Sequence, residues 1–285
     1  MADVALDTRD SMPRVQDYGP FRGLGGLTGA EFSRWLPWRA LTFTMLGLAL
    51  IAVMYANWLM QPAKILGELI FPFFTLWTLL LILTTVAATQ GMVANEITHG
   101  TAAWVVAKPV GKPAFVITKF IALVPVVIVA MVGVPGLVVR YVFAAAEGNG
   151  DTEFNGDEVL RLVNDPGARD IYTTVPGVGD YLGTLGLLAV ILLVVAAVMV
   201  LLGCVLHHPT AILAIGLLVP IAMLILTNSN VDHQIISLTP AWLMESFVES
   251  AGNDPAPLLA PILVGVLWIL GMLGLASWWF SRREL

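Results

Sequence analysis

Long apolar runs are the feature that most constrains this chain. An α-helix rises about 1.5 Å per residue, so about 20 apolar residues cross the roughly 30 Å hydrocarbon core of a bilayer. Six runs are long enough, although the fifth is short, and only 12% of all residues are charged, too few to cover the surface of a soluble domain. We therefore predict an all-α integral membrane protein. The six transmembrane helices are expected at residues 41–60, 69–90, 115–142, 181–206, 209–227 and 257–280, within a domain spanning 28–285.

The distribution of charge predicts the orientation. Lysine and arginine concentrate at residues 9–39, 108–119 and 282–283, whereas acidic residues dominate 147–180. Because basic residues mark the cytoplasmic side of a membrane protein, we expect both termini in the cytoplasm and the chain in the inner (plasma) membrane. Outer loops are predicted at 141–180 and 228–256.

Two further segments have patterns of their own. Residues 1–27 mix charge, proline and glycine, and are predicted to form a flexible cytoplasmic tail. Pro240–Ser250 begins with a proline and continues with apolar residues at helical spacing. A re-entrant or outer-surface helix is expected there, before the last span.

An amphipathic helix is predicted just before the first span. Thr28 and Glu31 have capping-box spacing, in which each side chain satisfies a backbone N–H near the start of a helix. Trp35 and Arg39 belong to the aromatic and basic residues that follow. Such a segment is expected to lie in the headgroup layer.

The segment Gln90–Phe120 is a charged island between two apolar runs. Gly100 can end one helix, and Thr101 can cap the next by accepting a bond from a free backbone N–H. Pro109 disfavours helix at Lys108, because a residue before proline is pushed out of the αR region. The pattern predicts a short, capped helical element on the membrane surface.

This segment resembles the cytoplasmic region between spans two and three of ABC-2 type transporter permeases. In that family an E-x-x-x-G-T element precedes [KR]-P-[VL]-x-[RK] and then a K-F-[IL] entry into the third span. The corresponding residues here are Glu96…Gly100-Thr101, Lys108-Pro109-Val110-Gly111-Lys112 and Lys119-Phe120-Ile121. Order and spacing agree over about thirty residues, and weaker agreement extends to Ala30-Glu31-Phe32 and Ser237-Leu238-Thr239-Pro240.

The resemblance implies an interfacial elbow helix, a cytoplasmic coupling helix and a transport complex. Two permease subunits, identical or different, would pair around a central path, and two copies of an ATPase subunit would dock beneath them. It implies ATPase contact or coupling at Glu96, His99, Gly100, Thr101, Trp104, Lys108 and Pro109. Asn57, Thr84, Thr85 and Thr89 are candidates for lining the path.

The ATP chemistry is expected in another chain. The sequence contains no G-x-x-x-x-G-K-[ST] phosphate loop, so we predict no enzyme activity and no cofactor here, with ATP and Mg on the partner. His207 and His208 are adjacent, so they point apart on a helix, and no carboxylate lies close to them in sequence; no metal site is predicted.

The singled-out residues also have simpler interpretations. Glu96 could pair with a basic group on the ATPase, anchor the coupling element, or be an ordinary surface carboxylate. Trp104 could fit a groove in a partner or lie in the lipid interface. Hydrogen bonding between helices explains the threonines as well as substrate contact does.

Two functional hypotheses follow. No Asp, Glu, Lys or Arg lies in the middle of a predicted span, which disfavours an ion-driven transporter. The first hypothesis is an ABC permease subunit that works in export. The second is a non-transporting membrane scaffold that docks an ATPase and, through the acidic 141–180 loop, an extracytoplasmic partner. Membrane lipid is an expected partner, and nucleic acid is not.

Overall fold

The computed structural model describes residues 21, 23–35, 38–59, 66–102, 111–148, 178–206, 208–227, 236–251 and 258–282. All regular secondary structure within these ranges is helical, which confirms the predicted fold class for them. The longer elements are α1 (Leu24–Trp35), α2 (Trp38–Leu59), α3 (Leu66–Thr89), α6 (Lys112–Pro125), the π-helix η2 (Val126–Gly133), α7 (Val134–Gly148), α10 (Val178–Val205), α11 (Pro209–Thr227), α13 (Ala241–Ala251) and α14 (Leu259–Arg282). The short helix α4 covers Ala94–Thr98.

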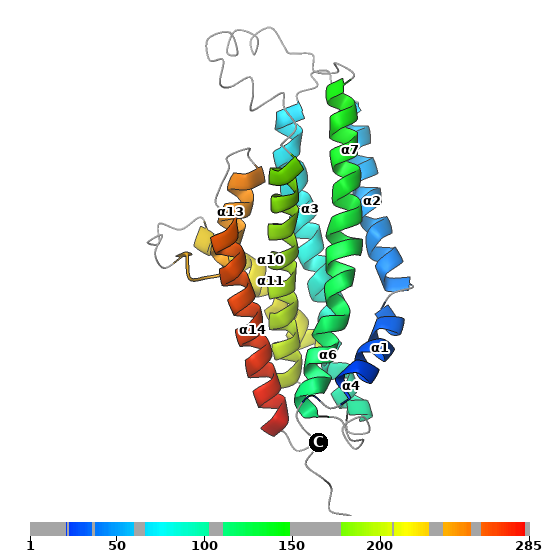
Figure 1. The fold of residues 1–285 in the computed structure, drawn as a ribbon, viewed down its shortest axis with the longest axis vertical. Coiled ribbons are helices and arrows are strands. Elements are labelled where there is room, and N and C mark those ends of the chain that lie inside the picture. The colour runs from blue at the N-terminus through cyan, green and yellow to red at the C-terminus, as the bar shows by residue number, and fades with distance from the viewer. Residues whose placement is uncertain are drawn as a thin grey trace, which may run out of the picture.

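The helices run along a common long axis (Figure 1). Helix α1, helix α4, the start of α6 and the end of α14 gather at the lower end in that view, which we call the α4 end. The start of α10 and the end of α7 lie toward the opposite end. Residues 94–102, residues 111–115 and the end of α14 are therefore on the same side of the molecule.

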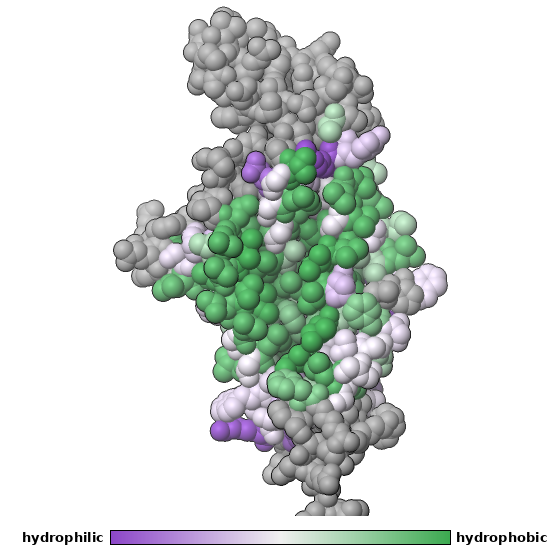
Figure 2. All heavy atoms as spheres, viewed as in Figure 1, coloured by the Kyte–Doolittle hydropathy of each residue, from purple (hydrophilic) through white to green (hydrophobic). Residues whose placement is uncertain are grey.

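Four helical segments are long and apolar enough to cross a membrane: Leu76–Thr98, Lys112–Val142, Val178–Val205 and Leu259–Arg282. Helix α1 and residues Trp38–Val53 of α2 meet at 47° and add a fifth if they form one broken span. The apolar part of α11, Pro209–Ala222, is shorter. Apolar side chains form a broad band across the middle of one face, with polar ones toward both ends (Figure 2). The six-span count remains a prediction.

The observed helix ends differ from the predicted loop ends. Helix α1 begins at Leu24, so the predicted tail of residues 1–27 extends too far, and residues 1–20 lie outside the described ranges. The predicted loop 141–180 begins inside α7, which continues to Gly148, and ends inside α10. Helix α13 confirms the helix predicted over Pro240–Ser250.

Helix α10 forms the centre of the bundle. It is apolar around its whole circumference, and a helix of that kind is stable only when neighbours surround it. In its most apolar stretch 72% of residues are buried, against 28% for α14, which packs on it from outside. Helices α3, α11 and α13 pack on α10 as well.

Gly265 lets α14 approach its neighbours closely. A Cβ atom at this position would lie 2.4 Å from Val190 Cγ1 and 3.0 Å from Leu243 Cδ1. Val190 belongs to α10 and Leu243 to α13, so one missing side chain accommodates two contacts. Small residues commonly allow such close helix packing in membrane proteins.

We expect Gly265→Ala to destabilise the protein by about 1–3 kcal/mol, because the added methyl group overlaps Val190 and Leu243. Gly271 on the same helix has no atom within 4 Å of its ideal Cβ position and is the matched control. Gly271→Ala should be neutral or slightly stabilising, since alanine loses less entropy in a helix. Thermal unfolding of both purified variants in the same detergent tests the pair. Equal effects would contradict the close packing at Gly265.

The third predicted span contains a π-helical segment between two prolines. Residues Val126–Gly133 follow Pro125, and Pro135 lies two residues beyond them. With π spacing the amide at position 135 would bond to the Ala130 carbonyl, but proline has no N–H. The Thr44 hydroxyl of α2 donates to that carbonyl at 3.1 Å. A neighbouring helix thus satisfies the carbonyl that the proline leaves without its helical donor.

Candidate functional site

The C-terminal end of α4 has the structure that the sequence predicts. Helix α4 stops at Thr98, and Gly100 follows with φ of +72°, in the left-handed region that favours glycine. The Gly100 amide donates to the Ile97 carbonyl at 3.2 Å and closes the turn. Helical conformation then resumes at Thr101 and Ala102.

Thr101 makes a contact that was not predicted. Its hydroxyl donates to the Glu96 carbonyl at 3.1 Å and closes the end of α4. The predicted bond from an amide of the next helix to this hydroxyl stays a prediction, because residues 103–110 lie outside the described ranges. His99 lies on the exposed side of the same turn, with Nδ1 2.5 Å from the Asn95 carbonyl oxygen.

Lys119 occupies the centre of the site. It lies in the second turn of α6, among apolar residues, and only 3% of its side chain is exposed. Its ammonium group contacts both the Glu31 carboxylate of α1 and the Glu96 carboxylate of α4. A buried charge is costly unless it is paired and hydrogen-bonded, and these two carboxylates provide the pairing.

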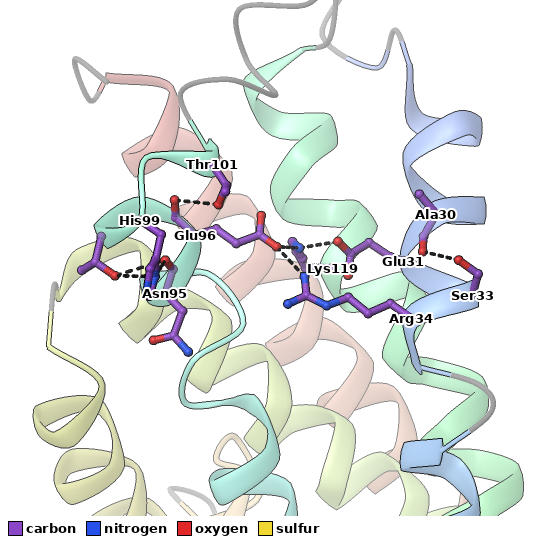
Figure 3. Close-up of polar contacts among 10 residues, drawn as sticks. Ala30, Glu31, Ser33, Arg34, Asn95, Glu96, His99, Thr101 and Lys119 are labelled. Carbon is purple, nitrogen blue, oxygen red and sulfur yellow. Dashed lines mark hydrogen bonds and ion pairs between the residues drawn. The ribbon is translucent and has the colours of Figure 1, made fainter.

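Arg34 extends this cluster toward the surface. One of its terminal nitrogens lies 2.9 Å from the same Glu96 oxygen that Lys119 contacts. Glu31, Arg34, Glu96 and Lys119 are together called the Lys119 network (Figure 3). Two positive and two negative groups balance each other in it, and it joins α1, α4 and α6 although their sequences are far apart.

The members of the network are unequal in burial. The side chains of Glu31 and Glu96 are 14% and 12% exposed, whereas that of Arg34 is 57% exposed. Solvent screens an exposed ion pair, so the Arg34 contact is worth at most about 1 kcal/mol. The Lys119 contacts are therefore the ones whose loss would leave a buried charge unpaired, and the Arg34 contact adds little.

Glu96 points inward from α4. Figure 3 shows its carboxylate directed to Lys119 and Arg34, while His99 and Thr101 lie on the other side of the turn. With both cations at one oxygen, Glu96 has the geometry of an anchor within the chain. Trp104, Lys108 and Pro109, also predicted at this site, lie outside the described residues.

The predicted capping box at Thr28 is wrong. Helix α1 begins one turn earlier, at Leu24, and the Thr28 hydroxyl donates to the Leu24 carbonyl at 2.7 Å. Glu31 does not cap the helix, and its carboxylate pairs with Lys119 instead. Gly23, with φ of +82°, precedes the helix and provides the turn that starts it.

Trp35 and Arg39 were both predicted to lie in the headgroup layer, and the position of Trp35 differs from that prediction. Trp35 is 1% exposed and packs in the core, so it does not extend into a headgroup layer. The Arg39 guanidinium lies over its ring, 4.5 Å from the centroid. Trp38, three residues after Trp35, is the tryptophan that faces outward, with 76% of its surface exposed.

The candidate path-lining threonines all lie on α3. Thr84, Thr85 and Thr89 donate their hydroxyls to carbonyls one turn earlier in the same helix, at 2.6–2.8 Å. Thr85 and Thr89 are 1% exposed, so neither faces open space within one subunit. Asn57 lies on α2, and its side chain is outside the described part of the structure. Their role in a path remains a prediction.

A pocket of about 260 Å³ adjoins the Lys119 network. Its lining comes from α1, α2, the end of α3, α4, α6 and α11, and includes Arg34, Arg39 and Lys119. Within the described ranges no group of three or more His, Cys, Asp or Glu side chains is arranged to hold a metal ion.

Two members of the network were not among the predicted site residues. Lys119 was visible as part of the K-F-I element, and Arg34 as a basic residue of the amphipathic helix. The available signal was a lysine in an otherwise apolar helical stretch, which implies a buried partner. Glu31 lies 88 residues away, and that separation hides the partner from sequence analysis.

Comparison of the sequence with models of protein families finds no matching family, and comparison with curated proteins finds no significantly similar sequence.

Proposed function

We propose that this chain is the permease subunit of an ABC transporter. Two such subunits, identical or different, form a path across the plasma (inner) membrane with six spans each and with their termini in the cytoplasm. Separate ATPase subunits bind at the α4 end and drive export. This chain supplies no catalytic residue, and ATP and Mg are held by the ATPases.

The Lys119 network is the observation that carries this proposal. A permease must transmit movement from a cytoplasmic partner to its spans. Here the buried Lys119 joins α4, which would meet the partner, to α1 before the first apolar helix and to α6 at the start of another. A displacement of α4 would therefore move two long helices together.

The resemblance at Glu96…Gly100-Thr101 provides the second support. It falls on the turn that the network anchors, and Gly100 has the left-handed conformation that the turn requires. The alternative scaffold function would use the same docking site without a path for cargo. Transport assays on the reconstituted complex separate the two functions.

Gly100 provides the sharpest test of partner docking. Proline requires φ near −65°, and it would also remove the Gly100 amide that bonds to Ile97. We expect Gly100→Pro to abolish co-purification of the ATPase when the two chains are co-expressed. Gly100→Asn is the matched control, because asparagine tolerates the left-handed region, and it should retain the complex.

Three outcomes decide the proposal. An ATPase that co-purifies with the wild type and with Gly100→Asn, but not with Gly100→Pro, supports it. Failure of every candidate ATPase to bind the wild-type chain would overturn it. A bound complex in vesicles that hydrolyses ATP but moves no solute or lipid would favour the scaffold.

A further inference from the structure

We propose that the pocket beside the Lys119 network binds the phosphate group of an anionic membrane phospholipid. This inference does not depend on the transport function. The pocket is lined by three cations, Arg34, Arg39 and Lys119, and by the two carboxylates Glu31 and Glu96. The four charges of the Lys119 network balance each other, so Arg39 supplies the net positive charge that a ligand meets.

Both arginines have donors left for a ligand. A guanidinium carries five N–H donors, and Arg34 directs one terminal nitrogen to Glu96. The Arg39 guanidinium lies over the Trp35 ring, and no residue within the described ranges accepts a hydrogen bond from it. Among the described residues, no carboxylate forms a salt bridge with Arg39. Arginines commonly bind phosphate through two parallel N–H bonds.

The surroundings favour a lipid over a soluble anion. Ala87 and Ala88 give the pocket an apolar wall. From Arg39 the exposed side of α2 continues through Leu46 and Val53, at seven-residue intervals, with 41% and 66% of their surfaces exposed. Seven residues are close to two helical turns, so these side chains lie on one face. A phosphate at Arg39 would have its acyl chains on this apolar face.

The size of the pocket agrees with a headgroup. Its volume of about 260 Å³ is below the roughly 300–1,000 Å³ typical of sites that enclose a whole small molecule. Only the polar end of an amphiphile would enter, and the chains would remain in the bilayer. Basic pockets near the membrane surface bind anionic lipid headgroups in this manner.

Native mass spectrometry of the full-length protein tests the site. The protein in detergent is offered equal amounts of phosphatidylglycerol and phosphatidylcholine with matched acyl chains. We expect phosphatidylglycerol to be retained preferentially, and Arg39→Gln to weaken its binding about tenfold, the effect of losing a charge-assisted bond. Arg39→Gln leaves the Lys119 network intact, so its folding is expected to be normal. Arg34→Gln combined with Arg39→Gln should weaken binding further.

Arg282→Gln is the matched control. Arg282 is also exposed at the α4 end and lies over a tryptophan, with its guanidinium 4.1 Å from the Trp278 ring, but it does not line the pocket. Its replacement should leave phosphatidylglycerol binding unchanged. Equal retention of both lipids, or an unchanged affinity in Arg39→Gln, would overturn the proposal. Displacement of the lipid by an equal concentration of inorganic phosphate would show a soluble-anion site and overturn it too.

Discussion

Replacing Lys119 with methionine is expected to destabilise the protein by about 3–5 kcal/mol. Methionine fills a similar volume, so packing on α6 is largely kept, but the only buried cation of the network is lost. Glu31 and Glu96 are then left together, 14% and 12% exposed; Glu96 keeps its contact with the partly exposed Arg34, and Glu31 loses the cation it pairs with. Thermal unfolding of the purified protein in detergent measures the effect.

A triple variant shows whether the unpaired carboxylates cause this loss. Glu31→Met and Glu96→Met, combined with Lys119→Met, remove every charge from the buried part of the network. Breaking a buried ion pair is costly, whereas replacing all its members with apolar groups of similar volume can be nearly neutral. We expect the triple variant to recover most of the stability. A triple variant as unstable as Lys119→Met would show that lost packing is responsible.

Most helices could be predicted from the sequence because a long apolar run has few alternatives in a membrane. The predicted span 181–206 corresponds to α10 at Val178–Val205, and 209–227 corresponds to α11 at Pro209–Thr227. The end of α4 was predictable for a similar reason. A left-handed turn residue strongly favours glycine, and Gly100 was the residue available.

The start of α1 was predicted wrongly because a local pattern had two uses. Thr28 and Glu31 have the spacing of a capping box, but Glu31 gains more from the buried ammonium of Lys119 than from a backbone amide near the surface. The helix then begins one turn earlier, at Leu24. The pairing of Glu31 depends on a residue of α6, so no local pattern indicates it.

The network as a whole lay beyond sequence reasoning for the same reason. Glu96 was singled out, but its partners on α1 and α6 are 62 and 23 residues away. The burial of Trp35 follows from the packing of α1 against α6, which amphipathic spacing alone cannot specify. A lysine in an apolar stretch implies a partner, but only the fold identifies which carboxylates meet Lys119.

If the proposed ATPase binds at α4, Glu96→Gln is expected to leave it bound while reducing at least about tenfold the protection from amide exchange that its binding gives to α1. Glutamine keeps the size of the side chain and should preserve the turn, which depends on Gly100 and Thr101. Its neutral amide loses two charged contacts, of which the buried one to Lys119 is worth about 1.5–3 kcal/mol, enough for a tenfold change. Arg34→Gln removes only the exposed contact and should have a much smaller effect.

Hydrogen exchange measures this coupling between α4 and α1, and the cargo need not be known. In the wild-type complex, binding of the ATPase at α4 should slow amide exchange in α1, because Lys119 and Glu96 connect the two helices. In Glu96→Gln the protection should remain in α4 and be lost in α1. Loss of protection in both helices would mean that Glu96 contacts the ATPase directly. Retention in both would mean that α1 reaches the partner by itself, and the network would then serve stability alone.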